Sequence, residues 1–383
     1  MSKESGGYLY NPFLIFNSPK FAELAGKTPS SRDRYVDFLR AFSITVVVIG
    51  HWMSAVIRVQ EGKILTYNAA GAIPGMWILT WVMQVMPLFF FVGGFSNLVT
   101  IEMLRRRGES IAAFYRKRAS RLLKPTLIFV VTWAVILTLI ALFVENAEVF
   151  IEKSTVVIGP LWFLVVYLGM VVVTPLMVQL HRKLRLGALV ILAGLIVLVD
   201  IVSFGFGVGW VRWTNVAFVW LFVHQIGFFY ADGSLVRMPR VFYIVMAIIG
   251  LAGLVVLTNI GVYPGSMVGT GIEKISNMNP PTVCIAVLTI WLVGLAMFLR
   301  EPLNRWLARR RPWSAVIAAN TMIMTLYLWH LTAFAVVFLM LYPLGFWRFA
   351  DGSLLWWLVR PVWIILPALV LSLFIGVFSR FER

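Results

Sequence analysis

The chain has 383 residues, of which 61% are hydrophobic and 13% are charged, and its mean hydropathy is +0.89. Soluble domains are about a quarter charged, so this composition excludes an ordinary soluble protein and predicts one that lies almost wholly in a lipid bilayer. The net charge of +17 invites a nucleic-acid partner. We predict none, because the Lys and Arg residues lie mainly in short loops between apolar runs, as in loops that face the cytoplasm.

Ten apolar runs predict ten transmembrane helices, most of them about 20 residues long and able to cross a hydrocarbon core of about 30 Å. The runs are continuously apolar rather than alternating, so the predicted fold class is an all-α, polytopic membrane protein. In chain order, the predicted helices span 36–57, 76–101, 125–145, 159–180, 187–202, 214–231, 241–260, 282–299, 316–340 and 356–378.

The polar residues at the start of the chain predict a cytoplasmic N-terminal segment, 1–33, without a cleavable signal peptide. Residues 34–383 then form one transmembrane domain. If the N-terminus is cytoplasmic and the helices alternate, 25 of the 33 Lys and Arg residues fall in cytoplasmic segments and 6 fall in outer loops. This bias supports the orientation and places both termini in the cytoplasm.

The first predicted helix carries two ionisable residues, Arg40 and His51. Eleven residues of α-helix are about 20° more than three turns, so both side chains share one face, about 16 Å apart along the axis. Ionisable groups in membranes usually face a protein interior or a wet cavity. Two interpretations remain open: Arg40 reaches the headgroups while His51 makes an interhelical hydrogen bond, or a cation and a base face one cavity. Asp37, one turn earlier, either pairs with Arg40 or is solvated.

Five stretches follow one another in an order that resembles the acyltransferase-3 family of membrane O-acyltransferases. They cover almost the whole chain and are "RYVDFLRAF" followed by His51, "MPLFFFVGGFSN", "FYRKRASRLLKP", "GPLWFLVVYL" and "LYLWHL". Many members carry a glutamate soon after the Leu-Trp-Phe-Leu motif, whereas this chain has "VVYLGM" there, with Tyr167 and no acid. The resemblance therefore leaves any carboxylate-assisted role at this place in doubt.

The resemblance implies transfer of a short acyl group, acetyl or succinyl, from acyl-coenzyme A to a hydroxyl of a cell-envelope glycan or glycolipid. Acyl-coenzyme A would be a co-substrate, with no bound cofactor, and the location would be the inner (plasma) membrane of a bacterium. "NMNPPT", at 277–282, is similar to actinobacterial members. The alternative is a transporter or flippase of an envelope lipid or glycan precursor, but the paired repeats common in transporters are not evident.

The chemistry of acyl transfer suggests roles for the residues in these motifs. Arg118 and Arg121 are three residues apart and suited to clamp a donor phosphate, with Arg116 and Lys124 as further donor-binding candidates. The positive-inside rule alone also accounts for much of this charge. Arg40 would bind a donor phosphate or lie at the entrance through which the acyl chain passes. His51 would act as a general base or carry the acyl group.

Six more polar or aromatic side chains are expected to line the cavity. Each has a structural alternative, as an interhelical hydrogen bond, a membrane-interface anchor or a satisfied core group. No two histidines have metal-ligand spacing with a carboxylate, so we predict no metal. The six residues are Ser96, Asn97, Trp162, Tyr167, Tyr327 and His330.

Overall fold

The computed structural model describes residues 19–29, 32–60, 63–145, 147–346 and 348–382. Within them, ten helical spans are long and apolar enough to cross a membrane, which confirms the predicted all-α membrane fold. The elements are α1 Pro19–Gly26, α2 Arg34–Ser54, β1 Ala55–Gln60, β2 Lys63–Asn68, α3 Ala69–Ala72, η2 Met76–Leu79, α4 Thr80–Met83, α5 Met86–Arg106, α6 Ile111–Phe143, α7 Ala147–Ile158, α8 Leu161–Leu184, α9 Leu186–Asp200, η3 Ile201–Gly205, η4 Gly209–Thr214, α10 Asn215–Ala231, α11 Arg240–Asn259, α12 Val283–Leu307, α13 Arg310–Thr321, α14 Ile323–Leu341, η5 Tyr342–Leu344, α15 Leu354–Val359, α16 Val362–Phe378 and η6 Ser379–Glu382.

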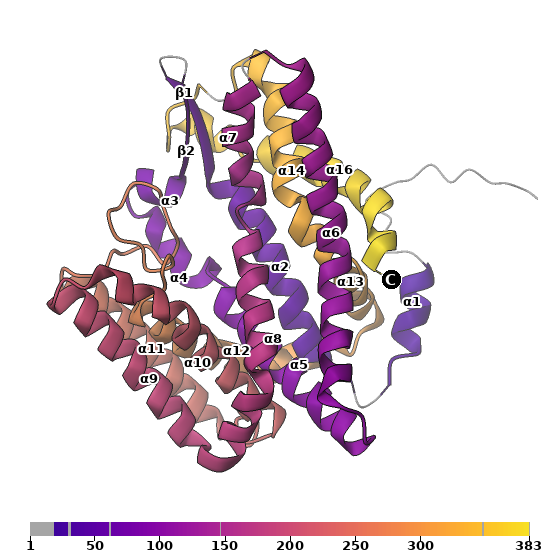
Figure 1. The fold of residues 1–383 in the computed structure, drawn as a ribbon, viewed down its shortest axis with the longest axis vertical. Coiled ribbons are helices and arrows are strands. Elements are labelled where there is room, and N and C mark those ends of the chain that lie inside the picture. Colours follow the sequence, from indigo (N-terminus) through magenta and orange to yellow (C-terminus); the bar gives the residue numbers. More distant parts are fainter. Residues whose placement is uncertain (1–18, 30–31, 61–62, 146, 347, 383) are drawn as a thin grey trace, which may run out of the picture.

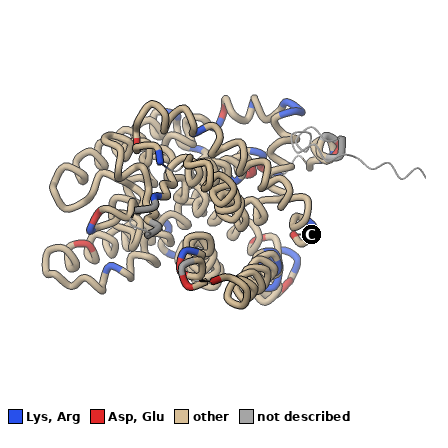
Figure 2. Tube along the Cα trace, turned by 90° about the horizontal axis from the view of Figure 1, so that it is seen from above, with Lys and Arg blue, Asp and Glu red and all other residues tan. Residues whose placement is uncertain are grey.

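The long helices form one bundle in which α2 lies among the later helices, with the β1–β2 hairpin at one extremity (Figure 1). We call the side of the bundle that holds this hairpin the hairpin end. The opposite side, where α2 begins and α5 is followed by α6, is the basic end. Along the chain trace, the charged residues form short segments that are separated by long uncharged segments (Figure 2). This pattern is expected when charge is confined to helix ends and loops.

Close backbone contact joins α5 to α10. A Cβ atom added to Gly94 would lie 2.0 Å from the carbonyl oxygen of His224, and one added to Gly227 would lie 2.1 Å from that of Phe91. Small residues allow such an approach between membrane helices. The amide nitrogen of Asn97 also lies 3.0 Å from Nε2 of His224 across the same contact. Gly94 therefore serves helix packing.

Two predicted helix boundaries differ from the structure near the basic stretch and the hairpin. The helix predicted to start at 125 begins at Ile111, so the basic residues 116–124 lie on α6 rather than in a loop. Ala, Leu, Arg and Lys are good helix formers. The helix predicted to end at 57 ends at Ser54, and the β-branched residues that follow pair as a strand.

Three other predicted helices are interrupted. The span predicted at 76–101 is divided into η2, α4 and α5, with Pro87 in the first turn of α5. The one predicted at 316–340 breaks at Met322 into α13 and α14. The last breaks before α16 at Pro361, which has no backbone N–H to continue the ladder.

The predicted N-terminal segment, 1–33, is only partly covered, because residues 1–18 and 30–31 lie outside the described residues. Its helix α1 packs against α13 and buries Phe21 and Ala25. This contact ties the described part of the segment to the basic end.

Candidate active site

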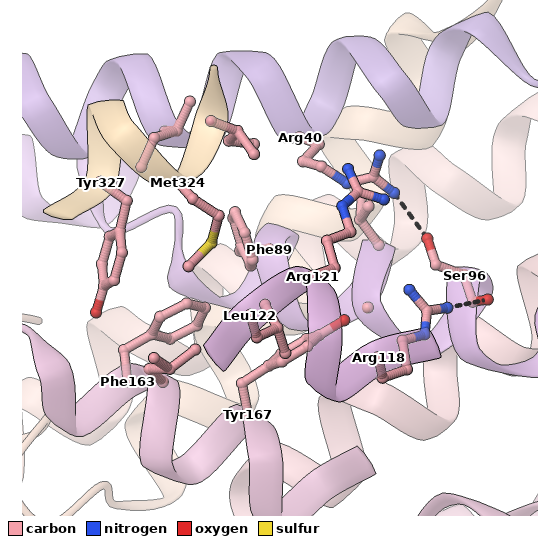
Figure 3. Close-up of a pocket in the computed structure, with 15 residues that line it drawn as sticks. Arg40, Phe89, Ser96, Arg118, Arg121, Leu122, Phe163, Tyr167, Met324 and Tyr327 are labelled. Atoms are coloured by element: carbon pink, nitrogen blue, oxygen red, sulfur yellow. Dashed lines mark hydrogen bonds between the residues drawn. The ribbon is translucent and has the colours of Figure 1, made fainter. Parts of the chain in front are cut away.

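A cavity of about 70 Å³ opens among α2, α5, α6, α8 and α14 towards the basic end. A volume of this size holds a few water molecules, whereas a cavity of about 150 Å³ accepts benzene. Figure 3 shows that the guanidinium groups gather at one end and the aromatic rings at the other. Its walls are Arg40, Ile44, Phe89, Val92, Gly93, Ser96, Arg118, Arg121, Leu122, Phe163, Leu164, Tyr167, Ile323, Met324 and Tyr327.

Arg40 and Arg118 are both held against α5 at the polar end of the cavity. Arg40 donates to Asp37 (3.0 Å) and to the Ser96 hydroxyl (2.7 Å). Arg118 donates to the Ser96 carbonyl (2.5 Å) and to the Thr100 hydroxyl (2.9 Å). These bonds fix two guanidinium groups around one turn of α5, where Figure 3 also shows them.

Positive charge at this end exceeds the negative charge that pairs with it. Asp37 is buried and pairs with Arg40, and it also bonds to Arg32 at 2.6 Å. In the described part of the chain, no ion pair joins Arg118 or Arg121 to a carboxylate. The Tyr167 hydroxyl points towards the arginines (Figure 3). The cluster thus offers charge-assisted donors to an anion.

The other end of the cavity is apolar and closed by Tyr327. Its hydroxyl donates to the carbonyl oxygen of Pro160 at the start of α8. Phe163 lies against Tyr327, with ring centroids 5.5 Å apart. Met324 lines the same end (Figure 3).

His51 lies beyond this closed end, and it is not among the lining residues. The sequence-based expectation that Arg40 and His51 face one cavity therefore does not describe this conformation. His51 is half-buried, and its Nδ1 lies 2.7 Å from Nε2 of His330, with the two rings stacked 5.0 Å apart. The Trp52 indole donates to the His330 carbonyl at 2.9 Å. These contacts join α2 to α14 at the histidine pair.

The hydrogen bonds around this pair determine where its protons lie. Nδ1 of His330 lies 2.7 Å from the carbonyl oxygen of Tyr327, which can only accept. A neutral His330 therefore carries its proton on Nδ1 and accepts at Nε2. His51 must then donate from Nδ1, which leaves the lone pair on its Nε2. The arrangement presents one imidazole nitrogen as a base.

The structure brings some of the predicted site residues together and separates others. Arg40, Arg118, Arg121, Ser96, Tyr167 and Tyr327 line the cavity. Asn97 faces α10, Trp162 is 43% exposed, and His330 stands behind Tyr327, so these three lie outside it. Arg116 and Lys124 are on the exposed side of α6 and do not line it either. The roles proposed for all of them stay predictions.

Sequence reasoning missed residues that shape the cavity from distant parts of the chain. Phe89, Phe163 and Met324 form apolar wall, and their types carry no signal that separates them from core residues. Glu382 accepts from the backbone of Met324 (3.2 Å) and Thr325 (2.6 Å), so the C-terminal tail caps α14 beside the cavity. Glu382 lies 58 and 57 positions after Met324 and Thr325, and no local pattern predicts such a contact.

The described residues contain no group of three or more His, Cys, Asp or Glu side chains that could hold a metal ion. In comparisons with known proteins, the acyltransferase-3 family model, an acyltransferase domain, matches residues 33–380. No curated protein and no solved structure matches the chain.

Proposed function

The chain belongs to the acyltransferase-3 family, and we propose that it moves an acetyl or succinyl group from acyl-coenzyme A to a hydroxyl of a cell-envelope glycan or glycolipid. The family and the ten spans identify a multi-pass membrane acyltransferase. We further propose that acyl-coenzyme A is the donor, that an envelope glycan or glycolipid is the acceptor, and that the protein lies in the bacterial inner membrane. The basic end would face the cytoplasm, with both termini, and the hairpin end would face outwards.

The arginine cluster supports a donor site at the basic end. Acyl-coenzyme A is cytoplasmic and carries several phosphate charges, which Arg118, Arg121 and Arg40 would bind with charge-assisted hydrogen bonds. The pantetheine arm is far larger than a cavity of about 70 Å³. Its entry therefore requires the apolar end to open, with Tyr327 leaving Pro160.

The observation that carries the proposal is the hydrogen-bond series from the Tyr327 carbonyl through His330 to His51. It orients an unprotonated Nε2 on His51, the state that a general base needs at neutral pH. His330 contacts His51 and not the reacting atoms, so it is a positioning residue.

In the proposed reaction, Nε2 of His51 takes the proton of the acceptor hydroxyl as the oxygen attacks the thioester carbonyl. The tetrahedral intermediate collapses, the carbon–sulfur bond breaks, and the imidazolium returns the proton to the coenzyme A thiolate. Ester and free thiol are the products. A second route, in which Nε2 first takes the acyl group and then passes it to the hydroxyl, uses the same lone pair.

The proposal is tested with labelled acetyl- or succinyl-coenzyme A and membranes that contain the wild-type chain or His51→Ala. Transfer of label to the lipid and glycan fraction should fall by about 10²- to 10⁴-fold, the usual contribution of a general base. His181→Gln is the matched control, because His181 lies outside the cavity, in contact with Asp232 and Gln225.

Equal amounts of folded protein are verified by gel filtration in detergent. Undiminished transfer in His51→Ala would contradict the assignment. Wild-type membranes that transfer no label from either donor would contradict the acyl donor and favour the transporter alternative.

A further inference from the structure

A second cavity lies at the hairpin end and is not used by the chemistry described above. Six aromatic side chains line it: Phe334, Phe338, Phe346, Phe349, Trp356 and Trp363. Residues 55–57 of the hairpin and two charged side chains, Arg360 and Asp351, complete the wall. Apolar pockets with a few polar groups are the usual form of a small-molecule site.

The histidine pair lies between the two cavities along both helices that carry it. Ala55 and Phe334 line the hairpin-end cavity, and each lies four residues, about 6 Å, beyond His51 or His330. Ile44 and Tyr327 line the other cavity and precede the same two histidines. A group held in the hairpin-end cavity would therefore approach the pair from the side opposite to the donor.

Arg360 is the unusual feature of this cavity, because it is a buried cation that forms no ion pair among the described residues. It is only 8% exposed and lies 3.6 Å from the ring centre of Trp356. One terminal nitrogen is 3.3 Å from the carbonyl oxygens of Met53 and Ala55 at the end of α2. Its Nε is buried with no hydrogen-bond partner, and no carboxylate in the described residues forms an ion pair with it.

The nearby carboxylate of Asp351 is already occupied. It accepts from Arg58 at 2.6 Å and from the Tyr67 hydroxyl at 2.6 Å. Burial, with the hydrogen bond to Asp351, raises the pKa of Tyr67, so the hydroxyl remains a donor. Asp351 attracts the charge of Arg360 and Arg58 repels it, so these two influences oppose each other. The α2 C-terminus and the Trp356 ring place partial negative charge beside the guanidinium.

We propose that the hairpin-end cavity binds the acceptor, and that Arg360 pairs with an anionic group, a phosphate or a carboxylate, that the acceptor carries near its reacting hydroxyl. This inference rests on the proposed function and specifies its acceptor. The aromatic side chains would pack against the apolar face of the attached sugar ring. The cavity measures about 20 Å³ in this conformation, room for about one water molecule, so its walls must move apart to admit the acceptor.

The first test determines the charge of the product. Membranes with the wild-type chain are incubated with labelled acyl-coenzyme A, and the labelled product is separated by anion exchange and analysed by mass spectrometry. The inference predicts a product that keeps a phosphate or a carboxylate outside the transferred acyl group. A labelled product that is neutral apart from that acyl group overturns the inference but leaves the proposed function intact, whereas no labelled product at all contradicts the proposed function.

The second test asks whether Arg360 recognises that charge. With the isolated acceptor, Arg360→Gln should raise the acceptor KM tenfold or more, and Arg360→Lys, which keeps the charge, should raise it less. Arg212→Gln is the matched control, because Arg212 also lies over an aromatic ring, Phe204, and has a buried unpaired Nε, but it does not line the cavity.

The acceptor KM of Arg212→Gln should equal that of the wild type. Trp356→Phe keeps the guanidinium and separates loss of packing from loss of charge, and it should change the acceptor KM less than Arg360→Gln does. An unchanged acceptor KM in Arg360→Gln, or equal increases in Arg360→Gln and Trp356→Phe, would overturn the inference. If Arg360→Gln does not fold, Arg360→Met, which keeps a long side chain without the charge, replaces it in both comparisons.

Discussion

The two cavities differ in the hydrogen bonds and ion pairs that their arginine side chains form. At the basic end, Arg40 and Arg118 are held by several hydrogen bonds, and Asp37 pairs with Arg40. At the hairpin end, Arg360 is buried against Trp356 without a carboxylate partner in the described residues. A hydrogen-bonded cluster suits a ligand with several phosphates that is bound and released from water, and a single buried cation suits recognition of one charge. The histidine pair between the cavities is where two such ligands would meet.

The largest fall in kcat among these variants is expected from substitution of His330, which lines neither cavity. His330→Leu removes the acceptor of the His51 Nδ1–H bond and frees His51 to adopt the other tautomer. We expect kcat to fall by about 10- to 100-fold, as for other residues that orient a reactive group, with both KM values unchanged. His330→Gln, whose side-chain oxygen can accept the same bond, should recover part of the loss.

The pH dependence of kcat distinguishes positioning from packing at this site. His330→Leu should shift the profile, whereas a variant that is merely less stable would lower kcat equally at every pH. A uniform loss in both His330→Leu and His330→Gln would contradict the positioning role.

A smaller effect is expected at the basic end. Arg118→Gln combined with Arg121→Gln should raise the KM for acyl-coenzyme A by about 10-fold or more, because a hydrogen bond to a charged group contributes about 1.5–3 kcal/mol. The acceptor KM should not change. Arg116→Gln is the matched control, since Arg116 is on α6 but faces away from the cavity. Equal donor KM values in all three proteins would exclude this cluster as the donor site.

The smallest effect is expected from a single methyl group in the cavity wall. A Cβ atom on Gly93 would lie 2.9 Å from the Tyr167 ring, whereas one on Gly169 has no atom within 4 Å. Gly93→Ala should therefore narrow the cavity and lower donor turnover several-fold. Gly169→Ala should keep the activity and raise the melting temperature slightly, because Ala is a better helix former than Gly by about 1 kcal/mol. Undiminished donor turnover in Gly93→Ala would contradict a role of Gly93 in the width of the cavity.

Much of the fold could be predicted from the sequence, because a membrane helix needs a long apolar run, and ten such runs are plain. The break at Met322 could not be predicted, since no Pro or Gly marks it in the sequence. The strand after Ser54 depends on pairing with residues 63–68, which a search for apolar runs does not detect. Arg40, Arg118 and Arg121 could be found as charged residues in a mostly apolar chain. Helical spacing placed Arg118 and Arg121 on one face of their helix.

The partner of His51 is the part that the sequence left open. Helical spacing relates residues of one helix only, and 279 residues separate His51 from His330. The same is true of Arg360, whose place in a cavity wall depends on contacts with Met53 and Ala55, about 300 residues earlier. Asp37, whose pairing the sequence left undecided, is buried between Arg32 and Arg40.

The most direct measurement is a structure of the protein with an acetyl-coenzyme A analogue in which a methylene group replaces the thioester sulfur. We predict that its phosphates contact Arg118 and Arg121 and that Tyr327 has left Pro160. We also predict that the ketone carbon lies beside His51, so that a hydroxyl oxygen placed about 3–3.5 Å from this carbon can hydrogen-bond to Nε2 of His51. An analogue bound with its ketone still on the arginine side of an unmoved Tyr327, or bound away from the cavity, would contradict the account.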